Sequence, residues 1–302
     1  MPTWVIETVA AAFTQNLRNV LQRRASGTFS VLGITFARFF YGLPFALVFC
    51  GALMVFVHGP LPAFSATTVA YAAVGGVSQI LANALLVYSY QLRSFAVATT
   101  FSKTDVAQSA LMSALILGEP PTWLAALGIA ISFIGVAALS VPRTALREGG
   151  WRAAFTGLPA LVGMASGAGF AFSAICSRAG TLSMGPGAPF VRATEFLVIV
   201  LVLQSILMGA YLALRRPLVL RQCVAGARQG VSIGATSALT SLLWFAALAE
   251  ANVAYVRAIG QIELVFALVA SRAVFKEQNR STEIAGMTIM TAGILMVVFG
   301  AH

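Results

Sequence analysis

Apolar residues form long stretches along the chain, separated by short polar connections. Ten stretches have roughly the 20 residues that a helix needs to cross the hydrocarbon core of a bilayer. They are 4–22, 29–57, 67–91, 95–117, 122–141, 155–178, 187–213, 229–250, 253–274 and 281–300. A chain in lipid must satisfy its backbone hydrogen bonds internally, and the sequence has no period-two runs typical of membrane β-strands. The pattern therefore predicts an all-α membrane protein with ten transmembrane helices.

The composition agrees with this pattern. Of the 302 residues, 59% are hydrophobic and 9% are charged, whereas about 25% of the residues of a soluble domain are charged. The net charge of +10 comes from basic residues scattered over the connections instead of gathered in one stripe. We therefore expect contacts between these residues and membrane lipids, and no nucleic-acid partner.

The basic residues lie mainly at one end of the predicted helices. The connections after the first, third, fifth, seventh and ninth helices carry thirteen of them, and the opposite connections carry only Arg178. The thirteen are Arg23, Arg24, Arg93, Arg143, Arg147, Arg152, Arg215, Arg216, Arg221, Arg228, Arg272, Lys276 and Arg280. Because basic connections stay in the cytoplasm, we expect a multi-pass protein of the cell inner membrane with both termini outside.

The chain also resembles itself at a constant offset of 158 residues. The pairs at this offset are Ala96 with Ala254, Asp105 with Glu263, Glu119 with Glu277, Gly128 with Gly286 and Gly135 with Gly293. Earlier in each half, an offset of 154 pairs Arg24 with Arg178 and Arg38 with Arg192. Each half has five predicted helices, an odd number, so the halves would enter the membrane in opposite senses. The sequence thus predicts two inverted-topology repeats, 1–148 and 149–302, an arrangement typical of secondary transporters.

The segment ALILGEPPTWLAALGIAISFIGVAAL and its counterpart SRAVFKEQNRSTEIAGMTIMTAGILMV, together with the two five-helix halves, resemble the EamA type of the drug/metabolite transporter superfamily. The G-E ending of one helix before a glycine-bearing helix is similar to the family signature. The resemblance implies two EamA-like repeats and export of amino acids, metabolites or drugs. Two features differ from the family: the first helix has AFTQNLRNVLQRR in place of a Trp-Gly-Asn pattern, and relatives of known fold are usually drawn with cytoplasmic termini.

Ionisable residues inside the predicted helices cost about 2.5–3.5 kcal/mol each on insertion scales, so they should face the bundle interior. From these residues and their polar and aromatic neighbours we predict a site for substrate binding and coupling. Its candidate residues are Arg38, Gln79, Asn83, Lys103, Asp105, Trp244, Tyr255, Arg257, Gln261 and Glu263. On a regular helix Lys103 and Asp105 would point about 200° apart and could not pair with each other. The cations among the candidates favour a substrate that carries a carboxylate.

Asp105 and Glu263 are candidates for a proton carrier, because burial and a nearby cation act in opposite directions on the pKa of a carboxyl group. The alternative is a permanent ion pair, for instance of Asp105 with an arginine on another helix, that serves only packing. Arg192 and Glu195, three residues apart, are interpreted as a local pair. The first helix carries a polar stripe that could line a cavity or lie at the bundle edge: Thr8, Gln15, Arg18, Asn19 and Gln22.

The sequence has only two histidines and contains no P-loop, HExxH or GxSxG motif, so we expect no enzyme activity, no metal and no cofactor. The glycine pairs of the last helix in each half mark a helix-packing surface that could also serve a homodimer. Glu119 and Glu277 are interpreted as structural anchors. We predict a proton-coupled secondary transporter that exports a small metabolite, such as an amino acid, by alternating access. The alternatives are a lipid-head-group flippase and a membrane-embedded enzyme.

Overall fold

The computed structural model describes residues 2–56, 65–89, 101–140, 157–266 and 281–301, and these residues form helices and connections without a strand. The helices are α1 (Thr3–Ala25), α2 (Val31–Phe40), α3 (Leu43–Phe56), α4 (Ala66–Ser89), α6 (Asp105–Met112), the π-helical turn η1 (Ser113–Leu117), α7 (Trp123–Ser140), α9 (Leu158–Leu182), α10 (Pro189–Arg215), α11 (Pro217–Ala225), α12 (Ala227–Glu250), α13 (Val253–Gly260) and α15 (Ser281–Gly300).

Five described helical segments are long and apolar enough to cross a membrane. They are Val31–Val55, Ala66–Ser89, Leu158–Leu182, Pro189–Arg215 and Ala227–Glu250. Shorter apolar helices cover Asp105–Leu117, Trp123–Val136 and Ala285–Gly300. The described part of the chain is therefore all-helical with several candidate membrane spans, as the apolar pattern predicts.

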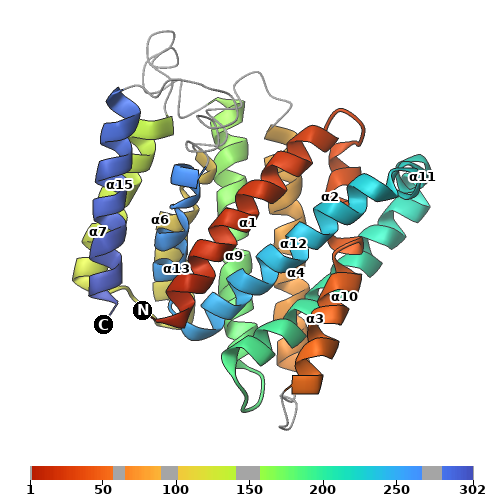
Figure 1. Cartoon of the computed structure of the whole chain (residues 1–302), viewed down its shortest axis with the longest axis horizontal. Coiled ribbons are helices and arrows are strands. Elements are labelled where there is room, and N and C mark those ends of the chain that lie inside the picture. Colours follow the sequence, from red (N-terminus) through yellow and green to blue (C-terminus); the bar gives the residue numbers. More distant parts are fainter. Residues whose placement is uncertain (1, 57–64, 90–100, 141–156, 267–280, 302) are drawn as a thin grey trace.

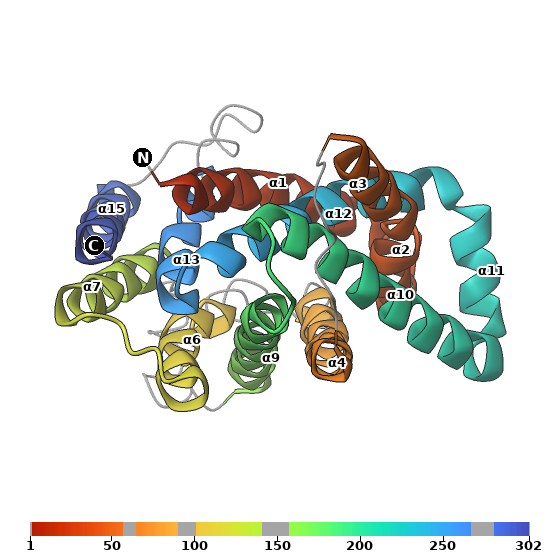
Figure 2. The ribbon, with the colours of Figure 1, turned by 90° about the horizontal axis from the view of Figure 1, so that it is seen from below.

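The helices pack side by side in one bundle (Figure 1). α7 and α15 form a pair at one edge, α1, α6, α9 and α13 lie near the middle, and α2, α3, α10 and α11 occupy the opposite edge. Seen from below, α6, α9 and α4 form one row and α1, α12 and α3 another, with α13 and α10 between them (Figure 2). The start of α1 and the end of α15 lie at the same end of the bundle.

Glycines set the contact between α7 and α15. A Cβ atom at Gly128 would lie 2.7 Å from the carbonyl oxygen of Gly293, and a Cβ atom at Gly135 would lie 2.5 Å from the backbone nitrogen of Met290. Only a residue without a side chain lets the two backbones approach this closely. The helix-packing surface predicted from these glycines is therefore used within the chain, between α7 and α15.

The predicted helix 29–57 is interrupted, because α2 and α3 are separated by Tyr41 and Gly42. This turn lies against α12. A Cβ atom at Gly234 would lie 2.3 Å from the carbonyl carbon of Tyr41, and one at Gly230 would lie 2.4 Å from the tyrosine ring. Two glycines on α12 thus make room for the turn between α2 and α3.

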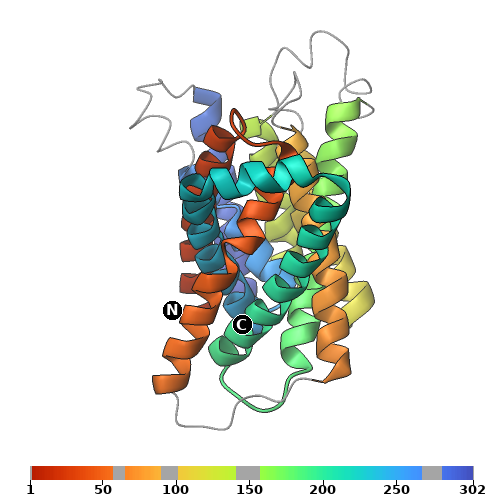
Figure 3. The ribbon, with the colours of Figure 1, turned by 90° about the vertical axis from the view of Figure 1, so that its right-hand side faces the viewer.

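The sequence pattern did not predict α11. Pro217 stands at its first position, where the fixed φ of proline suits a helix start and its missing N–H costs nothing. α11 runs across the bundle and connects α10 to α12 (Figure 3).

Six of the thirteen residues of the predicted basic face lie in the described part of the chain, at one end of the bundle. They are Arg23, Arg24, Arg215, Arg216, Arg221 and Arg228. They lie in the last turn of α1, at the end of α10, and in or beside α11, at the upper end in Figure 1. Arg178 is near the end of α9, at the opposite end. The remaining residues of the predicted basic face, and Glu277, lie outside the described residues.

Candidate functional site

Two helices are interrupted at positions related by the sequence repeat. Residues 103–104 form a turn just before α6, and residues 261–262 form a turn just after α13. The two turns are 158 residues apart, which is the offset of the sequence repeat. Each turn is followed by an acidic residue that begins a helical segment, Asp105 in one half and Glu263 in the other. The positive end of a helix dipole favours a carboxylate at that position.

The backbone hydrogen bonds show how the helices are interrupted. The N–H of Thr104 donates to the carbonyl of Phe101 at 3.2 Å, and the N–H of Gln261 donates to the carbonyl of Ala258 at 3.2 Å. Both bonds reach back three residues instead of four, as in a 3₁₀ turn. The regular helix assumed for Lys103 and its neighbours was therefore wrong, because the turn changes the direction in which consecutive side chains point.

Four charged side chains meet at these two turns. Nζ of Lys103 pairs with Oε1 of Glu263, and Nη1 of Arg257 lies 3.5 Å from Oδ2 of Asp105. Each pair joins a residue of the N-terminal half to a residue of the C-terminal half. We call them the crossed ion pairs, because the cation of each half contacts the acid of the other.

Two further side chains complete this group. Gln15 of α1 donates through Nε2 to Oε2 of Glu263, and its Oε1 accepts a hydrogen bond of 2.9 Å from Nε1 of Trp244 on α12. The guanidinium of Arg257 lies 5.1 Å from the centre of the Trp244 ring, which is within the range of a cation–π contact. We use the name central cluster for Gln15, Lys103, Asp105, Trp244, Arg257 and Glu263.

Main-chain contacts fix both the acid and the arginine of the C-terminal half. Asn16 donates through Nδ2 to the carbonyl of Glu263 at 3.0 Å, and Nη2 of Arg257 donates to the carbonyl of Phe170 on α9 at 3.0 Å. Arg18, one turn beyond Gln15 on α1, is buried and is close enough to Lys103 to repel its ammonium group. α1 is thus part of the site, and its predicted polar stripe faces the bundle interior at these positions.

The charged side chains of the central cluster are largely buried but keep some exposure to solvent. The exposed fractions of its charged side chains are 21% for Lys103 and 9% for Glu263, and 14% for Arg257 and 15% for Asp105. Charges this far from bulk water need partners or a wet cavity. The crossed ion pairs supply the partners in this conformation.

Two glycines allow the main chain to approach the cluster. A Cβ atom at Gly167 of α9 would lie 2.8 Å from the carbonyl oxygen of Ser102 and 3.2 Å from the backbone nitrogen of Asp105. A Cβ atom at Gly260 would lie 2.4 Å from Cη2 of Trp244. The first glycine positions the turn before α6, and the second leaves space for the indole that supports Arg257.

Three of the predicted site residues form other contacts. Arg38 donates to Oδ1 of Asn83, and Nδ2 of Asn83 donates to Oγ1 of Thr35 at 3.1 Å, which ties α2 to α4. Oε1 of Gln79 accepts a hydrogen bond of 2.9 Å from Nε2 of Gln204, which ties α4 to α10. These groups are buried, and their hydrogen bonds join α2, α4 and α10.

Gln261 and Tyr255 complete the predicted set. Gln261 is 3% exposed, and its Oε1 has no hydrogen-bond partner among the described residues. The hydroxyl of Tyr255 accepts a hydrogen bond of 3.1 Å from the backbone N–H of Thr122, just before α7. Gln261 therefore stays a candidate beside Glu263, whereas Tyr255 contacts the scaffold.

The predicted local pair between Arg192 and Glu195 was wrong. No ion pair joins them in the described structure, and both oxygens of the Glu195 carboxylate are buried without a hydrogen-bond partner there. Glu195 lies near Cys50 of α3, with which it interacts electrostatically. A spacing of three on a helix permits a pair but does not require one.

The sequence did not identify Gln15 as part of the site or Arg178 as a partner of Glu119. Gln15 could have been found from its place in the polar stripe of α1, but nothing local shows which helix that stripe contacts. No group of three or more His, Cys, Asp or Glu side chains suited to a metal ion occurs in the described part of the chain.

Comparisons with known proteins support the fold and the family. The model of the EamA-like transporter family matches residues 2–141. The search of curated proteins found no match. A solved structure described as "Crystal structure of protein" is similar to this chain with a TM-score of 0.71 and 15% sequence identity, covering 100% of this chain and 97% of that chain. This likeness shows a shared fold. Residues 2–141 thus match the EamA-like transporter family, which is part of the drug/metabolite transporter superfamily.

Proposed function

We propose that this membrane transporter is a secondary active exporter of a small zwitterionic metabolite, such as an amino acid, and that it works by alternating access. The observation that carries the proposal is the pair of crossed ion pairs at two interrupted helices. Interrupted helices at the interface of two repeats are where secondary transporters bind substrate. Export is the direction that the family resemblance implies.

The charges of the central cluster favour a zwitterion. Two cations face two carboxylates, so a substrate carrying one charge of each sign exchanges partners without leaving a charge unpaired. Its carboxylate contacts Arg257 or Lys103, and its ammonium contacts Asp105 or Glu263. An unpaired charge in this environment is costly, which disfavours a substrate of a single sign. Arg18 adds a third cation nearby, so among singly charged substrates an anion is preferred.

We propose two inverted repeats, 1–148 and 149–302, that move against each other around the central cluster. Two observations support this. The interrupted helices recur at the offset of 158 residues, and each crossed ion pair joins one half to the other. When the substrate replaces these pairs, two ionic contacts between the halves are broken. Substrate occupancy is thereby coupled to the motion of the halves.

We propose proton coupling through the same contacts. Asp105 contacts Arg257, and Glu263 contacts Lys103 and Gln15. Protonation of either carboxyl group removes its attraction for the cation and frees that cation for the substrate carboxylate. Exchange of protons for substrate therefore requires that one of these two groups changes its protonation state during the cycle. Asp105 is the simpler choice, because Glu263 is held by a hydrogen bond from Gln15 in addition to its ion pair.

The proposal is tested by flux in proteoliposomes. A panel of labelled amino acids, carboxylates and amines is measured with and without a pH gradient, and protein-free liposomes give the background. We expect flux of one or more zwitterions that a pH gradient accelerates. Asp105→Asn should abolish this acceleration, because a side-chain amide cannot take up or release the proton.

Glu195→Gln is the matched control, because it makes the same carboxyl-to-amide change outside the central cluster. It should keep the response to the gradient. Normal gradient-driven flux in the Asp105→Asn protein, at normal expression, would assign the Asp105–Arg257 pair to packing alone.

A further inference from the structure

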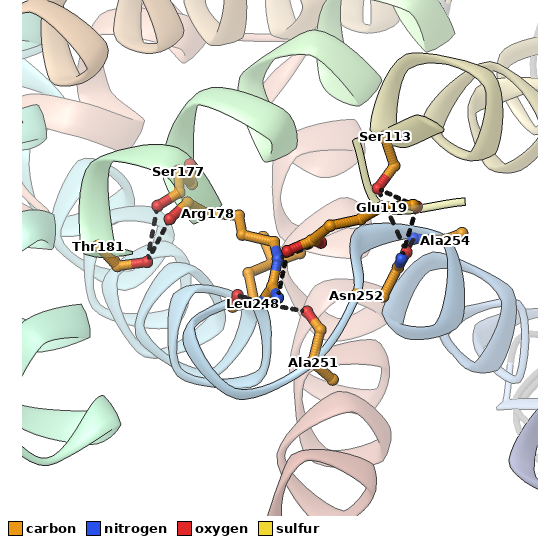
Figure 4. Close-up of polar contacts among 9 residues, drawn as sticks. All are labelled: Ser113, Glu119, Ser177, Arg178, Thr181, Leu248, Ala251, Asn252 and Ala254. Atoms are coloured by element: carbon orange, nitrogen blue, oxygen red, sulfur yellow. Dashed lines mark hydrogen bonds and ion pairs between the residues drawn. The ribbon is translucent and has the colours of Figure 1, made fainter. Parts of the chain in front are cut away.

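A second group of polar contacts links both halves near the end of the bundle where α1 begins (Figure 4). Nε and Nη2 of Arg178 donate to the two carboxylate oxygens of Glu119 at 2.7 and 2.8 Å. Nη1 of Arg178 also donates to the carbonyls of Leu248 at 2.9 Å and Ala251 at 2.8 Å. One guanidinium therefore connects the end of the α6–η1 segment, α9 and the end of α12.

Asn252 extends these contacts to α13. Its Nδ2 donates to the carbonyl of Glu119 at 2.8 Å, and its Oδ1 accepts from the N–H of Ala254 at 2.8 Å as the N-cap of α13. The hydroxyl of Ser113 approaches the same Oδ1 at 3.4 Å. We call Ser113, Glu119, Arg178 and Asn252 the end clamp.

The end clamp is built where the chain can bend. On the N-terminal side, α6 continues into the π-helical turn η1, which ends at Gly118 with φ of 67°. On the C-terminal side, α12 stops at Glu250 and α13 starts at Val253. π-Helical turns and breaks between helices are common hinge positions. The clamp thus holds two hinges together.

The helices held by the end clamp carry the crossed ion pairs at their other ends. α6 begins at Asp105, and the α6–η1 segment leads to Glu119 after about 20 Å at 1.5 Å per residue. α13 begins after Asn252, carries Arg257, and is followed by the turn before Glu263. A displacement at the end clamp is therefore transmitted along α6–η1 to Asp105 and along α13 to Arg257. The clamp itself is accessible, because the Glu119 side chain is 29% exposed.

We propose that the end clamp is the gate of this end of the transporter, closed in the conformation described here. It opens when the Glu119 carboxylate leaves Arg178, which separates the connection between η1 and α7 from the end of α9 and from the α12–α13 connection, and exposes the central cluster from that side. The gate assignment rests on the proposed alternating access. The competing explanation is a permanent tie that stays closed throughout the cycle.

The first test measures distances and needs no substrate. Nitroxide labels are attached at the exposed positions Trp123 and Leu182, at the start of α7 and the end of α9, in a protein whose three cysteines are replaced. Pulsed electron resonance then gives the distribution of distances in proteoliposomes. For Glu119→Gln we expect a population at longer distance that is larger by about tenfold, the equivalent of one charge-assisted hydrogen bond.

Glu250→Gln is the matched control, because this carboxylate lies at the same end but contacts Thr3 instead of a cation. It should leave the distances unchanged. Arg178→Lys keeps the charge but loses the two-point contact with Glu119, so it should enlarge the long-distance population to an intermediate extent. This variant replaces Glu119→Gln in the test if Glu119→Gln folds poorly. Identical distance distributions for the original protein and all variants would overturn the proposal that the end clamp is a gate.

The second test locks the clamp. Cysteines placed by Glu119→Cys and Arg178→Cys are joined with a short thiol-specific cross-linker. A gate predicts that the cross-link stops flux and that a cleavable linker restores it upon reduction. Unchanged flux in the cross-linked protein would show a permanent tie. A shift in distance without flux of any tested substrate would contradict the proposed function while leaving the opening of the clamp established.

Discussion

The crossed ion pairs make each of four charged residues depend on a partner in the other half of the chain. Lys103 lies beside Glu263, and Arg257 lies beside Asp105. Removing one member leaves the other in a shielded environment without its counter-charge, which costs more than the pair gains over apolar substitutes. Under the proposed function, exchange of these partners with a zwitterionic substrate is the reason that such costly charges stand inside the bundle.

Exchanging the charges of one pair tests whether the contact itself matters. Lys103→Glu alone and Glu263→Lys alone place like charges together, so we expect each to lower both the free energy of unfolding and the flux. The double exchange should recover about 1–3 kcal/mol relative to the sum of the single changes, as contacting residues do. Thermal unfolding and flux of the four proteins provide the measurement.

Partial recovery of stability without recovery of flux would mean that the position of each charge matters beyond the pair. This outcome is informative because Gln15 contacts only the Glu263 member of that pair. Additive effects of the two single changes would contradict an energetic link between these residues.

At the scale of elements, the site depends on two helices that are interrupted within apolar stretches predicted to be continuous. The apolar stretch 95–117 predicts one continuous helix, yet a turn interrupts it immediately before α6. The stretch 253–274 is interrupted in the same way after α13. Hydrophobic periodicity could not reveal these turns, because a 3₁₀ turn uses the same residue types as the helix around it. The position of the first turn is seen only in the packing against α9, where Gly167 faces the main chain of that turn.

Gly167→Ala should disturb the site without removing any of its charged groups. The added Cβ atom meets main-chain atoms of Ser102 and Asp105, and backbone cannot yield as a flexible side chain does. We expect a loss of about 1–3 kcal/mol in the free energy of unfolding, which is typical of overpacking, together with reduced flux.

Gly51→Ala on α3 is the control for this prediction, because its added Cβ atom meets no atom within 4 Å. It should leave both flux and thermal unfolding near the original values. If Gly167→Ala behaves like this control, the turn before α6 is not held by its contact with α9.

At the scale of the whole molecule, the charge distribution predicts the orientation in the membrane. The described residues of the predicted basic face lie around the end of α1 and α11, opposite the end where α1 begins and α15 stops. The one basic residue predicted on the other face, Arg178, is bound to Glu119. Its charge is therefore neutralised, which makes the asymmetry between the two ends larger than a count of basic residues indicates.

A reporter fused after His302 measures this orientation. We expect activity of a reporter that functions only outside the inner membrane and none from one that needs the cytoplasm, since the basic end stays inside. A fusion after Arg216, at the basic end, should give the opposite result and serves as the internal control. Cytoplasmic activity at His302 would agree with the orientation usually drawn for relatives and would show that the basic residues of this chain have another role.

The sequence by itself determined the all-helical class, the presence of several candidate membrane spans and the residues that carry charge inside the bundle. These follow from local properties, because lipid forces apolar stretches into helices and the repeat appears as matched letters at a fixed offset. It also placed Lys103, Asp105, Arg257 and Glu263 among the candidates, since buried charge is rare enough to be conspicuous.

Only the tertiary structure decided which of these residues meet. Lys103 contacts Glu263 and not its neighbour Asp105, and Arg178 contacts Glu119 in the other half. Partners 59 to 160 residues apart in sequence are chosen by the turns, the close helix contacts at glycines and the direction of each side chain. The energy of an ion pair depends on a separation of a few ångströms, and that separation is set by the packing of whole helices.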